Sequence, residues 1–166
     1  MPTSTLHQST SLGTFTLQAD NTGLCALLFP KEHETSFNNS AATETATAVH
    51  LPLLQEAADQ LLAYLDGRLY DFDLPISLGG TTFQQQVWQQ LQAIPYGETR
   101  SYGQVAAALG NRNKARAVGG AAHANPLGII IPCHRLIGAS GALTGFGGGL
   151  EMKHSLLTLE QRHRRR

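Results

Sequence analysis

Cys133, His134 and Arg135 follow one another directly and bring together a thiol, an imidazole and a guanidinium. Three branched apolar residues, 129–131, precede them, which predicts that the cysteine lies at the end of a buried strand. A cysteine attacks as its thiolate, and neighbouring cations or an imidazole lower the thiol pKa from about 8.5. The cluster is either a prepared nucleophile or a structural cysteine beside a chance basic pair, and these residues alone leave both open.

The chain has 166 residues and two cysteines, Cys25 and Cys133, which could form one disulfide. The polar N-terminus, residues 1–14, lacks the basic and apolar segments of a signal peptide. This favours two reduced thiols and a cytoplasmic location. No stretch approaches the roughly 18 consecutive apolar residues of a transmembrane helix, so we expect no membrane partner.

Charge divides the chain in two. Residues 1–79 hold two Lys or Arg against nine Asp or Glu, a net charge of −7, whereas residues 80–166 hold ten against three, a net charge of +7. The pair Gly79-Gly80 marks the boundary, so we expect one domain over 1–79 and another over 80–166. The asymmetry predicts that the second domain meets a polyanion, although Arg162 and Arg164 to Arg166 could be a solvated tail.

The first domain has the pattern of a small α/β unit. Its predicted elements are a hairpin of strands 14–19 and 24–29 around a turn at 20–23, a surface loop over 31–48, a helix from 52 to 65 ended by Asp66-Gly67, and a short strand over 70–76.

The second domain is predicted to be mostly helical, with helices capped by Thr82, Ser101 and Asn113 and a last helix over about 151–161. The helices 102–109 and 114–124 are joined by about four residues that include a glycine. That spacing fits a helix-turn-helix, with an ordinary helical hairpin as the alternative.

The predicted helix 114–124 combines a basic start with small residues. Arg112, Lys114 and Arg116 cluster where a DNA-reading helix presents its first residues to the groove. The small side chains let this helix approach another surface closely; they are Ala115, Ala117, Gly119, Gly120, Ala121 and Ala122. Residues 138–149 hold six glycines and form either a tight loop whose backbone approaches a ligand or a plain flexible loop.

The motifs of residues 82–166 resemble, in order, those of the O6-alkylguanine-DNA alkyltransferases, above all the bacterial stand-alone type. They are Phe83-Gln84 with Val87-Trp88, Ile94 to Thr99, Ser101 to Gly103, Ala115 to Gly119, Asn125-Pro126 and Ile131 to Arg135. The resemblance implies an α+β fold, with a small ribonuclease-H-like α/β N-terminal domain, which residues 1–79 match only in pattern. The implied C-terminal domain is mostly α-helical and carries a helix-turn-helix or winged-helix DNA-binding motif.

The function that the resemblance implies is direct-reversal DNA repair. Cys133 would take the alkyl group from O6 of guanine, or from O4 of thymine, and keep it as a thioether after one turnover. His134 would be the base, acting through a water and oriented by Glu160. Tyr102 would give its phenol proton toward the leaving guanine. The alternatives are a solvated acid for Glu160 and a packing role for Tyr102.

The implied partner is double-stranded DNA, from which the damaged base is rotated out through the minor groove by a monomeric protein. Arg116 would fill the space that the base leaves, or alternatively contact phosphate alone. The other implied DNA-binding residues are Arg112, Lys114, Ala117 and Gly119. The implied pocket residues are Asn125, Arg135, Phe146, Gly147 and Gly148; Asn125 is otherwise a helix C-cap.

The chain departs from the family pattern at the pocket. Phe146 stands where tyrosine is usual, and Gly128 replaces a bulkier wall residue of some relatives, so we expect a roomy pocket that accepts groups larger than methyl. Some relatives bind zinc in the first domain. Cys25 has no second cysteine nearby, and His33 and His50 alone do not make a site, so we expect no metal and no cofactor.

Two other functions stay open on the residues alone. A cysteine hydrolase would use Cys133 and His134 as nucleophile and base, but adjacent residues of a strand point to opposite faces, which disfavours direct proton transfer. A lesion-binding sensor would recognise damage without transfer, and the presence of Cys133 disfavours it.

Overall fold

The computed structural model describes residues 3–30 and 49–164, and the chain divides into two compact units, 1–78 and 79–166. The surface loop predicted over 31–48 lies outside the described residues, as do His33, Arg165 and Arg166.

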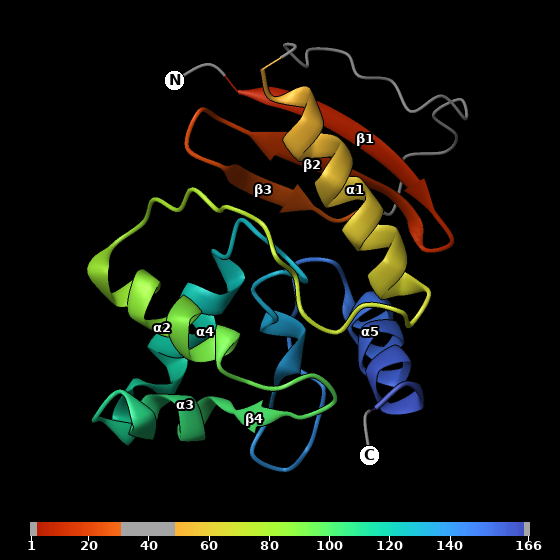
Figure 1. The fold of residues 1–166 in the computed structure, drawn as a ribbon. Coiled ribbons are helices and arrows are strands. Elements are labelled where there is room, and N and C mark those ends of the chain that lie inside the picture. The colour runs from red at the N-terminus through yellow and green to blue at the C-terminus, as the bar shows by residue number, and fades with distance from the viewer. Residues whose placement is uncertain (1–2, 31–48, 165–166) are drawn as a thin grey trace. The chain divides into compact units, whose positions relative to one another are not determined.

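Among its described residues, the first unit forms a three-stranded antiparallel sheet with a helix against it (Figure 1). The strands β1 (Ser4–Thr10), β2 (Gly13–Ala19) and β3 (Leu24–Leu28) lie in chain order, and α1 (Leu51–Leu65) packs on them. The predicted hairpin is confirmed as β2 and β3. β1 was not predicted, because its polar sequence does not indicate a strand. β1 pairs with β2 along its whole length, and alternate side chains of β2 are buried, namely Phe15, Leu17 and Ala19.

The predicted helix of the first unit is confirmed. α1 ends at Leu65, and Gly67 takes the left-handed conformation after it, with φ of 75°. Leu62 and Leu65 are half-buried, and Tyr64 is fully buried. The fully buried side chains of α1 are Leu54, Ala57, Ala58, Leu61 and Tyr64.

The short strand predicted over 70–76 is wrong. In this segment the described residues form only an isolated parallel bridge, between Ile76 and Leu24. Pro75 has no N–H to donate, and the N–H of Asp73 bonds to the Gln60 side chain at 3.0 Å. Residues 73 and 75 therefore have no backbone N–H left to donate to a neighbouring strand.

The second unit is mostly helical. α2 (Thr82–Gln92), α3 (Tyr102–Ala108) and α4 (Ala115–His123) pack on one another, and α5 (Leu150–Arg162) is the last helix (Figure 1). A short parallel pair joins β4 (Arg100–Ser101) to β5 (Leu136–Ile137), and no sequence pattern predicted it. The helices predicted from Ser101 onward are present.

Two of the three predicted helix caps are wrong by one or two residues. Ser101 caps α3 as predicted, but α2 is capped by Thr81, whose hydroxyl accepts from the Gln84 N–H at 3.1 Å. Asn113 caps nothing; Asn111 caps a short 3₁₀ turn, η1 (Arg112–Lys114), and α4 begins after it. In each case a side chain two or three residues earlier in the chain accepts from the exposed N–H.

The core of the second unit explains part of the small-residue pattern in α4. Ala121 and Ala122 are buried, and the Trp88 indole donates to the carbonyl of Ala121 at 2.9 Å. Their small size therefore lets α4 pack closely on α2. Gly120 and Ala117 face outward.

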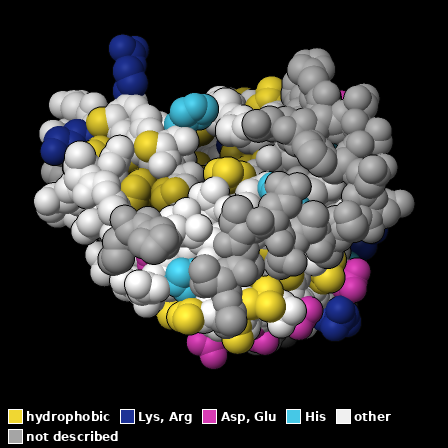
Figure 2. Space-filling model, turned by 90° about the horizontal axis from the view of Figure 1, so that it is seen from above, with side chains coloured by type: hydrophobic (Ala, Val, Ile, Leu, Met, Phe, Trp, Pro, Cys, Tyr) yellow, Lys and Arg dark blue, Asp and Glu magenta, His cyan; other side chains and the backbone are white. Residues whose placement is uncertain are grey.

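The face drawn in Figure 2 carries its hydrophobic side chains in small separate groups. Among the described residues, the large apolar side chains that are exposed are Leu28, Val49 and Leu150. No helix in the described part of the chain is long and apolar enough to cross a membrane.

Candidate active site

Cys133 begins a 3₁₀ turn, η2 (Cys133–Arg135), and is half-buried. The buried strand predicted before it is wrong. Ile129 has φ of 69°, and the Ile131 N–H returns to the carbonyl of Leu127 at 2.9 Å, so the chain turns back on itself. A positive φ strains a β-branched residue by about 1–3 kcal/mol, so the surrounding packing must hold this bend. Because η2 is not a strand, the argument from opposite strand faces does not apply to His134.

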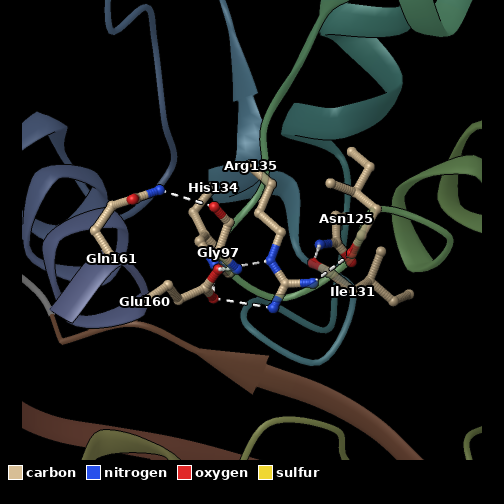
Figure 3. A network of polar contacts seen from close by, with 8 residues as sticks. Gly97, Asn125, Ile131, His134, Arg135, Glu160 and Gln161 are labelled. Atoms are coloured by element: carbon tan, nitrogen blue, oxygen red, sulfur yellow. Dashed lines mark hydrogen bonds and ion pairs between the residues drawn. The ribbon is translucent and has the colours of Figure 1, made fainter. Parts of the chain in front are cut away.

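Asn125 closes this bend (Figure 3). Its side-chain oxygen accepts from the Leu127 N–H at 2.9 Å, and its side-chain nitrogen donates to the Ile131 carbonyl at 2.8 Å. One amide thus joins the two ends of the turn that delivers Cys133. The helix cap of α4 is Ala124, so the C-cap alternative for Asn125 is wrong by one residue.

The carboxylate of Glu160, on α5, is the centre of a buried polar cluster (Figure 3). It accepts from His134 Nε2 at 2.6 Å, from Arg135 Nε at 2.8 Å and Nη2 at 3.0 Å, and from the Gly97 N–H at 3.1 Å. Glu160 and His134 are 0% exposed, which excludes the solvated-acid alternative for Glu160.

Arg135 is committed to this cluster and does not line an open pocket as we expected. Its third hydrogen-bonding nitrogen, Nη1, donates to the Ile94 carbonyl at 2.6 Å, and its guanidinium lies 5.7 Å from the Tyr96 ring centre. Gln161 holds the same segment by donating to the Gly97 carbonyl at 2.8 Å. Segment 94–97 is therefore fixed by both η2 and α5.

The protonation states of the cluster follow from its charges. Burial opposes ionisation of Glu160, but the hydrogen bonds and positive charge of His134 and Arg135 outweigh it and hold the pKa of Glu160 well below its usual range. Burial lowers the pKa of His134, against the pull of Glu160, and Arg135 adds to the lowering. His134 is therefore neutral at pH 7, and because Nε2 donates to Glu160, Nδ1 carries the lone pair.

The surroundings of Cys133 do not lower the pKa of its thiol. Burial raises its pKa, although a hydrogen bond from Asn125 and the charge of Lys153 act in the opposite direction. The guanidinium of Arg135 is turned toward Glu160, so it does not prepare the thiolate. Cys133 is thus a protonated thiol at rest and needs a base.

Lys153 is a residue that the sequence analysis missed. It lies on α5, is 1% exposed, and donates from Nζ to the carbonyl of Thr144 at 3.1 Å. Burial lowers its pKa, and the charge of Cys133 raises it. The buried face of this helix consists of Lys153, Leu156 and Glu160, whereas Met152, Leu157 and Leu159 are half-buried. Lys153, Leu156 and Glu160 follow one another at spacings of three and then four residues, which places them on one helix face, and this spacing was the signal that could have found Lys153.

Tyr102 is the first residue of α3 and is half-buried. The β4–β5 pairing lies directly before it, and β5 follows η2, so the two segments that carry Tyr102 and Cys133 meet there. Its phenol oxygen accepts a hydrogen bond from the Thr144 hydroxyl at 2.8 Å, and a methyl group placed on Gly119 would lie 3.6 Å from its ring.

The expected DNA-binding residues lie around the start of α4. Arg112, Lys114, Arg116 and Ala117 are exposed, and Gly119 is half-buried. The Lys114 ammonium lies 5.2 Å from the ring centre of Phe83, which ties η1 to α2.

The glycine-rich loop 138–149 contains no helix or strand. In it Gly147 is exposed, and Phe146 and Gly148 are half-buried; Gly128, in the bend before Cys133, is buried. The described residues contain no group of three or more His, Cys, Asp or Glu that could hold a metal ion.

Two family models match the chain. The DNA-binding domain of 6-O-methylguanine DNA methyltransferase matches residues 82–162, and the ribonuclease-like domain of the same family matches residues 5–78. A methylated-DNA–protein-cysteine methyltransferase of Mycolicibacterium paratuberculosis is 57% identical over 107 residues, which are 64% of this chain and 65% of that relative. The match thus spans less than two thirds of that relative's length.

Solved structures match over more of the chain. The O6-methylguanine methyltransferase of Mycobacterium tuberculosis is 42% identical with a TM-score of 0.82, covering 99% of this chain and 96% of that one. The M. tuberculosis OGT in complex with DNA is 43% identical with a TM-score of 0.79, covering 95% and 92%.

Replacing the central carboxylate should destabilise the protein. Glu160→Gln leaves Arg135 buried with its charge uncompensated, which costs about 3–5 kcal/mol. Urea denaturation followed by circular dichroism measures this loss. Glu151→Gln is the matched control, because Glu151 is exposed in the first turn of the same helix and contributes only about 0.3–1 kcal/mol. Equal losses in the two variants would contradict the cluster.

The buried neutral imidazole should make stability depend on pH. Because the pKa of His134 is lowered in the folded state, only the unfolded chain binds this proton just below pH 6.5. Stability should therefore fall as the pH drops below 6.5, by at most about 1.4 kcal/mol per pH unit. His134→Asn should flatten this slope in urea titrations. An unchanged slope would show that His134 is not the responsible group.

Proposed function

We propose that this chain, which belongs to the 6-O-methylguanine DNA methyltransferase family, repairs DNA by moving an alkyl group from O6 of guanine to Cys133. O4 of thymine is the second proposed target. The observation that carries the proposal is the cysteine at the bend closed by Asn125, directly followed by a buried His134–Glu160–Arg135 cluster. Such a thiol with an adjacent oriented base can act as a nucleophile.

In the proposed reaction, Sγ of Cys133 attacks the alkyl carbon, so that an S–C bond forms as the C–O6 bond breaks. The thiol proton passes through a water to Nδ1 of His134, and the Glu160 carboxylate stabilises the imidazolium that results. The bonding electrons go to guanine, which receives the phenol proton of Tyr102. The imidazolium proton then returns to the phenolate through solvent.

Each protein molecule reacts once in this scheme. The product on the protein is a thioether, and nothing in the reaction regenerates the thiol. Because the chain's own side chains and one water balance every atom and proton, the proposed reaction needs no cofactor and no metal. The raised pKa of Cys133 makes the base necessary, since the resting thiol is protonated.

Double-stranded DNA is the proposed partner. The net charge of +7 in residues 80–166 and the exposed basic start of α4 support it. A target base must leave the stack before its O6 can meet Cys133, at a cost of a few kcal/mol. We assign Arg116 to the space that the base leaves, because it is exposed in the first turn of α4.

We also propose a cytoplasmic location. Both cysteines are free thiols, and reducing compartments keep them so. An oxidised Cys133 could not accept an alkyl group.

Intact-mass spectrometry after incubation with an O6-methylguanine duplex tests the function. We expect a gain of one methyl group per chain that saturates at one equivalent, and none in Cys133→Ala. Cys25→Ala is the matched control and should still gain the methyl group. A Cys133 that turns over repeatedly without mass gain would indicate a hydrolase. Binding of the lesion with no gain in wild type would indicate a sensor.

The role of Arg116 predicts a difference between substrates. Arg116→Ala should slow transfer from duplex DNA by about tenfold or more, because the empty stack is no longer filled, and should leave transfer from free O6-benzylguanine unchanged. Arg112→Ala is the control. It should mainly weaken DNA binding and reduce the slope of log K against log salt by about 0.9. Equal loss on duplex and free base would contradict the role of Arg116.

A further inference from the structure

Thr144 and Tyr102 are 42 residues apart, and their hydroxyl groups form a hydrogen bond of 2.8 Å. We propose that Thr144 is a positioning residue that aims the phenol proton of Tyr102 at the leaving guanine. This inference rests on the proposed function and adds to it a residue of the glycine-rich loop.

The backbone of Thr144 is held by a buried lysine of α5. Lys153 of α5 donates from Nζ to the Thr144 carbonyl at 3.1 Å, and the lysine is 1% exposed. Burying a lysine is costly unless its ammonium is hydrogen-bonded. The bond therefore fixes the backbone of Thr144 to α5, although the threonine side chain itself is exposed.

The ends of the loop are closed by its own backbone. The Gly138 N–H bonds to the Ala142 carbonyl at 2.8 Å, and the Gly149 N–H bonds to the Phe146 carbonyl at 3.0 Å. Thr144 lies between these two turns and bonds outside the loop to both α3 and α5. The loop thus carries the threonine hydroxyl to a defined place beside Tyr102.

Tyr102 is restrained on its other sides. Its helix starts with a capping box between Ser101 and Gln104, and its ring lies near Gly119 of α4. The phenol oxygen accepts a hydrogen bond from the Thr144 hydroxyl, so its own single proton must point elsewhere. Thr144 therefore decides which direction is left for that proton.

The same hydrogen bond favours the transition state. As Tyr102 gives up its proton, negative charge develops on the phenol oxygen, and a donated hydrogen bond to a charged oxygen is stronger than one to a neutral oxygen. Removing a donor from a preorganised oxyanion site costs about 10²–10³ in rate. Because Thr144 is exposed, we expect a smaller loss, of about tenfold.

The test is a double-mutant cycle on the full chain with O6-methylguanine duplex under single-turnover conditions. Thr144→Val keeps the shape and removes the hydroxyl, and should lower the transfer rate constant about tenfold. Thr144→Ser keeps a hydroxyl and should restore the rate to within about twofold of wild type. In a Tyr102→Phe background, Thr144→Val should cause no further loss, because the hydroxyl acts through the phenol.

The outcomes separate this inference from the proposed function. Wild-type transfer with an unchanged rate in Thr144→Val would overturn the role of Thr144 alone. Multiplicative losses in the double variant would do the same, because they would mean that Thr144 acts on the loop and not through Tyr102. A wild type that transfers nothing would overturn the proposed function and this inference together. Duplex affinity and urea midpoints of all variants are measured in parallel and should match wild type.

Discussion

The second unit depends on one buried carboxylate. Removing a carboxylate from water costs several kcal/mol, and Glu160 is stable in the interior because His134, Arg135 and Gly97 donate to it. These donors belong to two segments far from α5 in the chain, so satisfying the charge also fixes where η2 and segment 94–97 lie. The need to stabilise the buried charge of Glu160 thus determines the positions of these segments, independently of any reaction at Cys133.

Arg135 has a second consequence, for proton transfer. A carboxylate beside a lone imidazole raises the imidazole pKa, which would leave His134 protonated and unable to accept a proton. Here burial lowers the pKa of His134 against the pull of Glu160, and the positive charge of Arg135 adds to the lowering. Glu160 can then orient the imidazole without protonating it. Arg135 thereby assists burial in keeping the base neutral.

The geometry around Cys133 depends on a few small contacts between segments that are distant in the chain. Asn125 closes a bend that contains Ile129 in a strained conformation, and the two-residue pairing of β4 with β5 joins the start of α3 to the end of η2. None of these contacts buries a large area. They act because the helices α2 to α4 and the cluster at Glu160 provide a rigid frame for them.

The sequence by itself determined the helices, the β2–β3 hairpin and the motif that contains Cys133, because these depend on local periodicity, caps and turn residues. It also indicated Glu160 and Tyr102 through a family resemblance. Only the tertiary structure decided that residues 129–131 turn instead of forming a strand, and that Arg135 faces Glu160. It also revealed that Lys153 bonds to the Thr144 carbonyl and that the Thr144 hydroxyl bonds to Tyr102. The physical reason is that a buried charge or a strained bend is stable only with partners distant in the chain, and local patterns carry no information about those partners.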